Sequence, residues 1–467
     1  MSWIDRLLPR RKGAPTASSK GSETAATPAQ PQYLWRQATG AETGSRPDGA
    51  PFPRFQSTAG DHLDPRTADK FAVVRAKLRN AYTPAQPVTD RRMFSGRTKV
   101  LTTLIRSIED QRLHTVIYGE RGIGKTSLLH VLAQTAHDAR YLVVYVTCGA
   151  RSEFDETFRA IAANIPLIYH SAYGPTSVEG ERGDTLVDIL PPDAITVRSA
   201  VDTMAKIEGT RVLVILDEYD RAGSEDFRRS IAELLKSLSD QSVRVQFLIA
   251  GVAANLTELV ENVPSIQRNI FAMQVPKMTA SEIRSVVKNG EGAADLNFDN
   301  GAIHAIIARC IGFPYLASLI SHRAALVAVD QNRLVVTADD VATATSEAVD
   351  EFKDRITRRS QMQIGEQVRK GRLPALGALA GAAQSTGGWF TLEDITSVHA
   401  DPAAINDAKA AADRMAAEHV LIEVREDEYG RIYRFLEASV PIYLWLLAAR
   451  GEFFAQESSE PRQEPAA

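Results

Sequence analysis

The chain has 467 residues, of which 44% are apolar and 24% charged, and its 54 basic and 58 acidic side chains give a formal net charge of −4. This composition is typical of globular proteins and excludes a wholly disordered, collagenous or coiled-coil chain. The length predicts about two to four domains. Because the charges nearly balance, the molecule as a whole has no strong field to attract nucleic acid or an acidic membrane.

The sequence indicates neither a membrane span nor a disulfide framework. The longest apolar run, Val440 to Ala449, is far shorter than the roughly 20 residues that a membrane-spanning helix needs. Cys148 and Cys310 both lie in apolar segments, which favours core positions in a reducing compartment. The histidines show no metal-ligand spacing, so no zinc site is expected. We therefore predict a cytoplasmic protein.

Both termini are predicted to be tails. Between Gly13 and Gly60, 32 of 48 residues are Gly, Pro, Ala, Ser or Thr. Such a segment cannot bury enough apolar area to offset the entropy lost on ordering. We assign 1–66 to a disordered N-terminal tail and 455–467 to a second tail. Met1 to Lys12 combines Trp and Leu with a basic run. It is either a frayed terminus or a docking or membrane-touching helix.

Residues 67–278 are predicted to form an α/β domain, the core of the protein. Four short apolar segments without alternation resemble strands buried on both faces of a parallel sheet. Helical patterns separate them, as in βαβ units, which predicts a three-layer αβα fold. The region from His170 to Asp193 is rich in Gly, Pro and acids and reads as a surface loop. The expected strands are Thr115–Tyr118, Tyr141–Cys148, Arg211–Leu216 and Val245–Ala250, with a shorter one at Ala272–Val275.

A glycine-rich motif follows the first expected strand and opens a helix. It matches the pattern G-x-x-x-x-G-K-[ST], whose glycines let backbone N–H groups wrap phosphates. The lysine, Lys125, would reach the β- and γ-phosphates, and the Thr126 hydroxyl would coordinate Mg²⁺. The candidate nucleotide-binding residues of this loop are Gly119, Glu120, Arg121, Gly122, Ile123, Gly124, Lys125, Thr126 and Ser127.

An acidic pair follows the third expected strand, Arg211–Leu216. A carboxylate beside a buried strand is costly without a partner, and Mg²⁺ would supply one. Asp217 is therefore the candidate metal-binding carboxylate. Glu218 is the candidate for polarising the attacking water.

The remaining chain is predicted as two helical units. Thr279 and Glu282 form a capping box that opens a helical lid, assigned to residues 279–364. Within it, further helices are expected at Ile303–Ile311 and Tyr315–Val329 and from Val341 to Arg359. Residues 365–454 are predicted as three helices followed by a hairpin around Asp427–Arg431, which is a winged-helix order.

The order of these features resembles the AAA+/STAND ATPases, and most closely bacterial proteins with an origin-recognition-like ATPase domain. The features are Phe94-Ser-Gly-Arg97, the phosphate loop, Asp217-Glu218 and then Gly312-Phe-Pro314 in the lid. The resemblance covers about Thr67 to Arg450. It implies an ATP-binding, ATP-hydrolysing protein that requires Mg²⁺.

The resemblance also implies roles for particular residues. Phe94, Gly96 and Arg97 match the family's box on the adenine side of the site, and Pro314 matches the proline packed near the base. Arg268 lies where related ATPases place an arginine finger for a neighbouring subunit, which implies self-association.

Two departures from the family favour a STAND-like switch over a fast motor. Ile249-Ala-Gly251 replaces the polar sensor at the end of the fourth strand, with Asn255 as a possible substitute. The lid-sensor arginine is missing from Gly312–Pro314, with only Arg309 nearby. ATP is preferred to GTP because the GTPase base-reading motif Asn/Thr-Lys-x-Asp does not occur.

The winged-helix region decides between two classes of function. We expect an ATPase switch that acts through protein partners, and the alternative is a DNA-binding ATPase such as a replication initiator or transcriptional regulator. Between Arg372 and Arg450 there are seven basic and eleven acidic side chains. Because DNA affinity comes largely from neutralising phosphates, this acidity disfavours DNA binding by the wing.

Overall fold

The structure is a computed structural model that describes residues 69–174, 176–253, 256–259, 267–386, 388–398, 402–427 and 430–459. The chain divides into Met1–Gly60 and Asp61–Ala467, and every described residue belongs to the second unit. The predicted N-terminal tail thus lies outside the described residues. The last helix, α17 (Val440–Ser459), continues into the predicted C-terminal tail, of which 460–467 lie outside the described residues.

A five-stranded parallel sheet forms the centre of the α/β region, as predicted, with strand order β2-β3-β4-β1-β5. The β1–β4 and β1–β5 pairs place β1 inside the sheet, between β4 and the edge strand β5. The strands are β1 (His114–Tyr118), β2 (Leu142–Thr147), β3 (Val212–Asp217), β4 (Val245–Gly251) and β5 (Ile270–Gln274).

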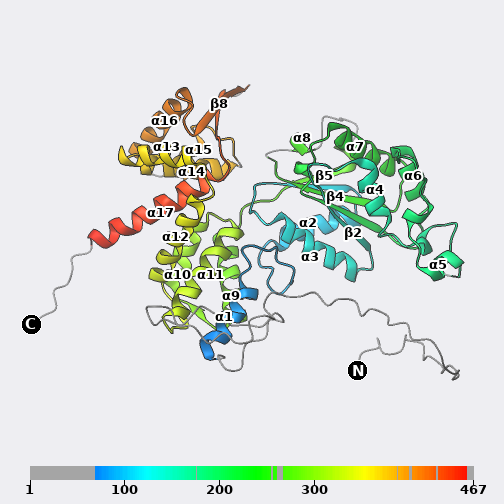
Figure 1. The fold of residues 1–467 in the computed structure, drawn as a ribbon, viewed down its shortest axis with the longest axis horizontal. Coiled ribbons are helices and arrows are strands. Elements are labelled where there is room, and N and C mark those ends of the chain that lie inside the picture. The colour runs from blue at the N-terminus through cyan, green and yellow to red at the C-terminus, as the bar shows by residue number, and fades with distance from the viewer. Residues whose placement is uncertain are drawn as a thin grey trace, which may run out of the picture. The chain divides into compact units, whose positions relative to one another are not determined.

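Helices cover both faces of this sheet (Figure 1). Alternate residues of β3 enter two different apolar clusters, Leu213 and Ile215 on one face and Val212 and Val214 on the other. Burial on both faces explains the continuous apolar runs of these strands. The helices of this region are α2 (Thr98–Glu109), α3 (Lys125–Asp138), α4 (Phe154–Ala162), α5 (Val178–Arg182), α6 (Val197–Met204), α7 (Glu225–Asp240) and α8 (Leu256–Leu259).

The segment predicted as a surface loop, His170 to Asp193, is more structured than expected. It contains α5, which Ser177 caps by accepting a hydrogen bond from the Gly180 N–H, and a 3-10 turn at Leu186–Ile189. Leu186 is fully buried in the cluster under α4 and α6. The buried Leu186 side chain therefore anchors to the core a segment whose composition favours a surface loop.

The lid is mainly helical and begins at the predicted capping box: Thr279 and Glu282 exchange hydrogen bonds at the start of α9. Two two-residue strands, β6 (Asn297–Phe298) and β7 (Val335–Val336), pair in parallel within it and were not predicted. Helix α1 (Lys70–Ala81), from the other end of the chain, packs on α9 and α11. The lid helices are α9 (Ala280–Ala294), α10 (Asn300–Cys310), α11 (Pro314–Asp330) and α12 (Ala338–Lys353).

The C-terminal region has the predicted order of helices followed by an antiparallel hairpin. The helix expected from Val341 to Arg359 is two helices, because the Thr357 side chain caps a new one by accepting from the Ser360 N–H. The elements are α13 (Arg358–Arg369), α14 (Leu373–Thr386), α15 (Asp394–Val398), α16 (Pro402–Ala417), β8 (Ile422–Asp427), β9 (Gly430–Phe435) and α17. Within the described residues, no helix has the length and apolar character to cross a membrane.

Candidate functional site

The predicted phosphate loop connects β1 to α3. Gly122 and Gly124 have φ angles of +80° and +90°, a region that side chains rarely adopt. A Cβ atom on Gly124 would lie 3.1 Å from Arg97 Nη1 and 3.3 Å from Pro314 Cγ. Glycine is therefore required here by both backbone conformation and close packing, and Arg97 and Pro314 approach the loop together.

Lys125 is held inside the loop by backbone carbonyl groups. Its Nζ donates to Gly119 O at 2.8 Å and to Glu120 O at 2.9 Å. Burial lowers the pKa of Lys125 to about 8, opposed by the charges of Asp220, Asp217 and Glu120. An ammonium group with only carbonyl partners, at the start of a helix, provides the positive potential that a phosphate group needs.

Asp217 ends β3 as a buried carboxylate, 4% exposed. Oδ2 accepts from the Tyr145 hydroxyl at 2.6 Å, and Oδ1 accepts from the Glu218 N–H at 2.8 Å. The Tyr145 ring stacks on His130 of α3, with ring centroids 5.0 Å apart and 2° between the planes. The carboxylate orientation is thus fixed from β2 and, through His130, from the phosphate-loop helix.

Glu218 has a left-handed backbone, with φ +53° and ψ +34°, and a partly exposed side chain. Its Oε2 accepts from Arg221 Nη1 at 2.6 Å. In this form its carboxylate is therefore engaged by an arginine of its own turn.

Two charged residues that the sequence did not single out belong to this site. Asp220 Oδ1 accepts from the Val252 N–H at 2.8 Å, and its charge is the strongest of those that raise the pKa of Lys125. A carboxylate therefore stands at the end of β4, where the sequence shows only Ile249-Ala-Gly251. Asn255, the suggested substitute there, lies outside the described residues.

The second residue is Lys277, which lies beside the loop residue Glu120. The Nζ–Oε1 distance is 3.8 Å, and Nζ also donates to Gln384 O of α14 and lies 4.5 Å from the centre of the Phe313 ring. Burial raises the pKa of Glu120 to about 7, although Lys277 and Lys125 act in the opposite direction.

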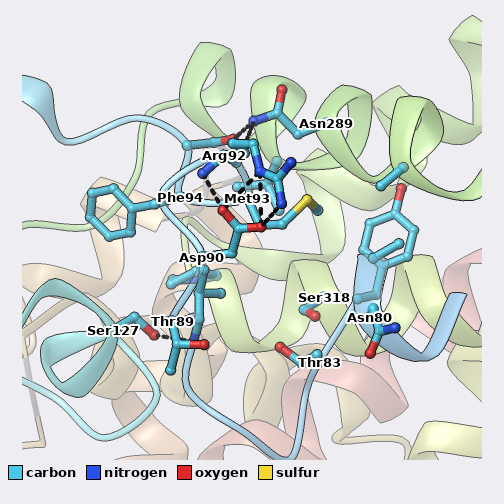
Figure 2. A pocket seen from close by; sticks show the side chains of 18 of the residues that line it. Asn80, Thr83, Thr89, Asp90, Arg92, Met93, Phe94, Ser127, Asn289 and Ser318 are labelled. Carbon is cyan, nitrogen blue, oxygen red and sulfur yellow. Dashed lines mark hydrogen bonds and ion pairs between the residues drawn. The ribbon is translucent and has the colours of Figure 1, made fainter. Parts of the chain in front are cut away.

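A cavity of about 870 Å³ adjoins the loop and contains the predicted adenine side of the site. Phe94, Arg97, Gly124, Ser127 and Pro314 all line it, together with residues of α1, α9 and α11. Figure 2 shows Phe94 and Ser127 among the lining residues and Asn289 of α9, which donates to the Arg92 carbonyl. The structure thus brings the Phe94–Arg97 segment, the phosphate loop and Pro314 of the lid together.

The remaining predicted residues have clear positions. Gly96 lies against Glu282, because a Cβ on it would be 2.8 Å from Glu282 Cγ. Ser127 Oγ accepts from the Val88 N–H at 3.0 Å, Ile123 is buried in the core, and Arg121 is exposed.

Arg268 lies apart from the other candidates. It is exposed in the 3-10 turn Gln267–Asn269 before β5, and β5 pairs with β1 from Ile270 opposite His114. Parallel pairing puts Arg268 at the amino edge of the sheet, whereas the phosphate loop is at the carboxyl edge. Most of the preceding segment, residues 260–266, lies outside the described residues.

The residues present fit a magnesium–nucleotide complex. The Asp217 carboxylate and the Thr126 hydroxyl are the hard oxygen donors that Mg²⁺ prefers, and Lys125 and the loop N–H groups suit phosphates. No cluster of three or more His, Cys, Asp or Glu suited to a metal occurs in the part of the chain that the structure describes. Cys148 and Cys310 are both buried free thiols.

Comparison with known proteins agrees with this geometry over the α/β region. A family model described as an AAA domain matches residues 106–260. No curated protein matches the chain.

Several solved structures are similar to the chain. The Aeropyrum pernix ORC2 protein has 15% identity and a TM-score of 0.42, with 82% of this chain and 98% of that chain covered. The Thermotoga maritima RuvB Holliday junction branch migration motor has 14% identity and a TM-score of 0.42, with 76% and 95% covered. The Walker-type ATPase of Pyrococcus abyssi has 15% identity and a TM-score of 0.45, with 77% and 98% covered. Likeness at this level carries no functional conclusion.

Proposed function

We propose that the chain is a Mg²⁺-dependent, ATP-hydrolysing switch of the STAND, origin-recognition-like type, which acts through protein partners. The proposal starts from the P-loop ATPase domain of the AAA class at residues 106–260. The observation that carries the proposal is the convergence of Lys125, Asp217 and Asp220 at the carboxyl ends of β1, β3 and β4. Open α/β sheets bind ligands at this edge.

The reaction is in-line attack of water on the terminal phosphorus of ATP, which breaks the bond to the β,γ-bridging oxygen and releases ADP and inorganic phosphate. It is assisted by positioning and charge neutralisation. Lys125 and the loop N–H groups would hold the phosphates, and Asp217 and Thr126 would hold the metal. Mg²⁺, when bound, neutralises charge on the phosphate oxygens. Glu218 orients the water and accepts its proton, for which its carboxylate must leave Arg221.

Support for a switch rather than a motor comes from the two departures in the sequence. Arg309, the arginine near the Gly312–Pro314 turn, lies on α10, and its Nη1 donates to the Ala305 carbonyl. The contact of Lys277 with both Glu120 and α14 provides a path from the phosphate loop to the C-terminal helices. A protein-docking winged helix and a cytoplasmic location are part of this proposal.

The test is thermal shift of the full chain with Mg-ATP, comparing the wild type with Lys125→Ala. At a hundredfold excess over its Kd, a ligand that binds only the folded form stabilises it by about 2.7 kcal/mol. We expect this gain in the wild type and its loss in Lys125→Ala. An equal gain in both proteins would refute the phosphate-loop assignment.

One observation favours DNA binding as a second candidate function. Between Lys353 and Arg372 there are seven basic and two acidic side chains. Arg358, Arg359 and Arg369 of α13 are exposed and have no ion pair among the described residues. A hollow of about 920 Å³ runs between Arg359 and Arg369 along this helix. The basic surface therefore lies before the acidic wing rather than on it.

Fluorescence anisotropy of the full chain with duplex DNA at several salt concentrations tests this candidate. If α13 contacts phosphates, replacing Arg358, Arg359 and Arg369 by Ala lowers the affinity and flattens the salt dependence, by about 0.9 in log–log slope for each lost contact. The matched control replaces three exposed arginines of the α/β region, Arg106, Arg112 and Arg140. Absence of salt-sensitive binding by the wild type would leave the protein-docking switch.

A further inference from the structure

Arg97 carries a buried guanidinium group with few partners. The residue is 3% exposed and immediately precedes α2, with a left-handed φ of +56°. Its backbone N–H donates to Glu282 Oε1 at 2.7 Å, and its Nη2 donates to Pro276 O at 3.1 Å. Its Nε is buried and has no hydrogen-bond partner. Such a group is costly unless another partner satisfies it.

The guanidinium lies against the phosphate loop. Nη1 is the atom nearest to the Cβ position of Gly124, at 3.1 Å, and Gly124 directly precedes Lys125. Neither Nη1 nor Nε donates to a carboxylate of the described residues, since Glu282 receives only the backbone N–H of Arg97. The Arg97 guanidinium and the Lys125 ammonium therefore meet at one loop, and no carboxylate of the described residues is hydrogen-bonded to either group.

We infer that Arg97 binds the phosphate groups of the nucleotide, rather than lining only its adenine side as the sequence resemblance implies. This inference rests on the proposed function. A guanidinium presents a planar fork that matches phosphate oxygens, and charge-assisted bonds of this kind are among the strongest hydrogen bonds in proteins. In the Phe94–Arg97 segment, Phe94 thus lines the cavity beside the loop, and Arg97 lies against the phosphate loop itself. Arg97 is also anchored to the lid by Glu282.

A ligand series distinguishes phosphate recognition from base recognition. Kd values for adenosine, AMP and ADP are measured by calorimetry on the full-length wild type and on Arg97→Met, which keeps side-chain length without charge. We expect an unchanged Kd for adenosine and a Kd for ADP about ten- to a hundredfold weaker, the range for a lost hydrogen bond to a charged group. Arg97→Lys keeps the charge but loses the fork, so its loss should be smaller.

Arg92→Met is the matched control, because Arg92 lines the same cavity but is 89% exposed and pairs with Asp90. It should show no loss that grows with phosphate number. Circular dichroism checks folding, and Arg97→Lys carries the test if Arg97→Met does not fold. An equal loss for all three ligands, or none, would overturn the inference. If the wild type bound none of them, the proposed function would fail first and the role of Arg97 with it.

Discussion

Arg221 Nη1 lies 2.6 Å from Glu218 Oε2, so the carboxylate proposed to activate water is paired within its own turn. The two side chains are 62% and 44% exposed, and exposed ion pairs of this kind contribute little to stability. The pair can therefore open at little cost when nucleotide and metal bind. The ion pair with Arg221 therefore holds the Glu218 carboxylate only weakly before nucleotide binds.

Replacing Glu218 by Gln is expected to retain ATP binding and nearly abolish turnover, because an amide cannot accept the proton of the attacking water. Calorimetry with ATP and phosphate release under the same conditions separate the two effects. Glu225→Gln, in the exposed first turn of α7, serves as the control with normal turnover. Unchanged hydrolysis by Glu218→Gln would remove Glu218 from the mechanism.

Tyr145→Phe is expected to lower the affinity of the site for Mg²⁺ without unfolding the protein. The change deletes only the hydroxyl that donates to Asp217 Oδ2 and keeps the ring stacked on His130. Loss of a group that orients a metal ligand typically lowers metal affinity about 10- to 100-fold. A Mg²⁺ titration of nucleotide binding measures this shift, with Tyr173→Phe as control. Metal affinity equal to that of the wild type would show that Asp217 needs no orienting hydroxyl.

Glu120 gives a pH dependence whose sign is fixed by the direction of its pKa shift. Burial raises its pKa from 4.5 to about 7, so between these values the folded form binds more protons than the unfolded form. Stability from this group is complete below pH 4.5 and is lost as pH rises through 7. Glu120→Gln should therefore raise Tm relative to the wild type at pH 8 more than at pH 5.

Differential scanning fluorimetry at the two pH values, without nucleotide, measures this difference. Glu181→Gln on the exposed helix α5 controls for the general effect of removing a carboxylate. A difference between wild type and Glu120→Gln that is the same at both pH values would contradict the raised pKa.

The sheet could be predicted from sequence because its strands are buried on both faces and therefore read as continuous apolar runs. Helix α2 was not predicted, although Leu104 and Ile108 recur at helical spacing and are buried. The break at Thr357 was also missed, because Val341 to Arg359 contains neither Gly nor Pro.

The candidate site was predictable where its residues are contiguous, in the loop and at Asp217-Glu218. Asp220 and Lys277 join it through tertiary contacts, Asp220 with the end of β4 and Lys277 with Glu120 of the loop. No spacing in the sequence connects these pairs. The position of the Arg97 side chain likewise depends on the packing of Gly124 and Pro276, which a single sequence does not reveal.

Arg268 is separated from its own phosphate loop by the length of the sheet. It precedes Ile270, which pairs with His114, whereas the loop begins after Tyr118 at the other end of β1. At about 3.3 Å per residue, the strand alone is longer than an arginine side chain. An arginine exposed at this edge can therefore reach a phosphate only in a second copy of the chain.

We accordingly predict that Arg268→Ala keeps its ATP affinity but loses turnover, as arginine fingers contribute about 10³- to 10⁵-fold where they are known. Wild-type specific activity should rise with protein concentration as subunits associate. Mixing Arg268→Ala with Lys125→Ala should restore part of the activity, because one copy supplies the intact arginine and the other the intact loop. Arg229→Ala, at an exposed arginine of α7, should behave as the wild type. Specific activity that does not change with concentration, together with no rescue on mixing, would show that the enzyme works as a monomer and that Arg268 is an ordinary surface residue.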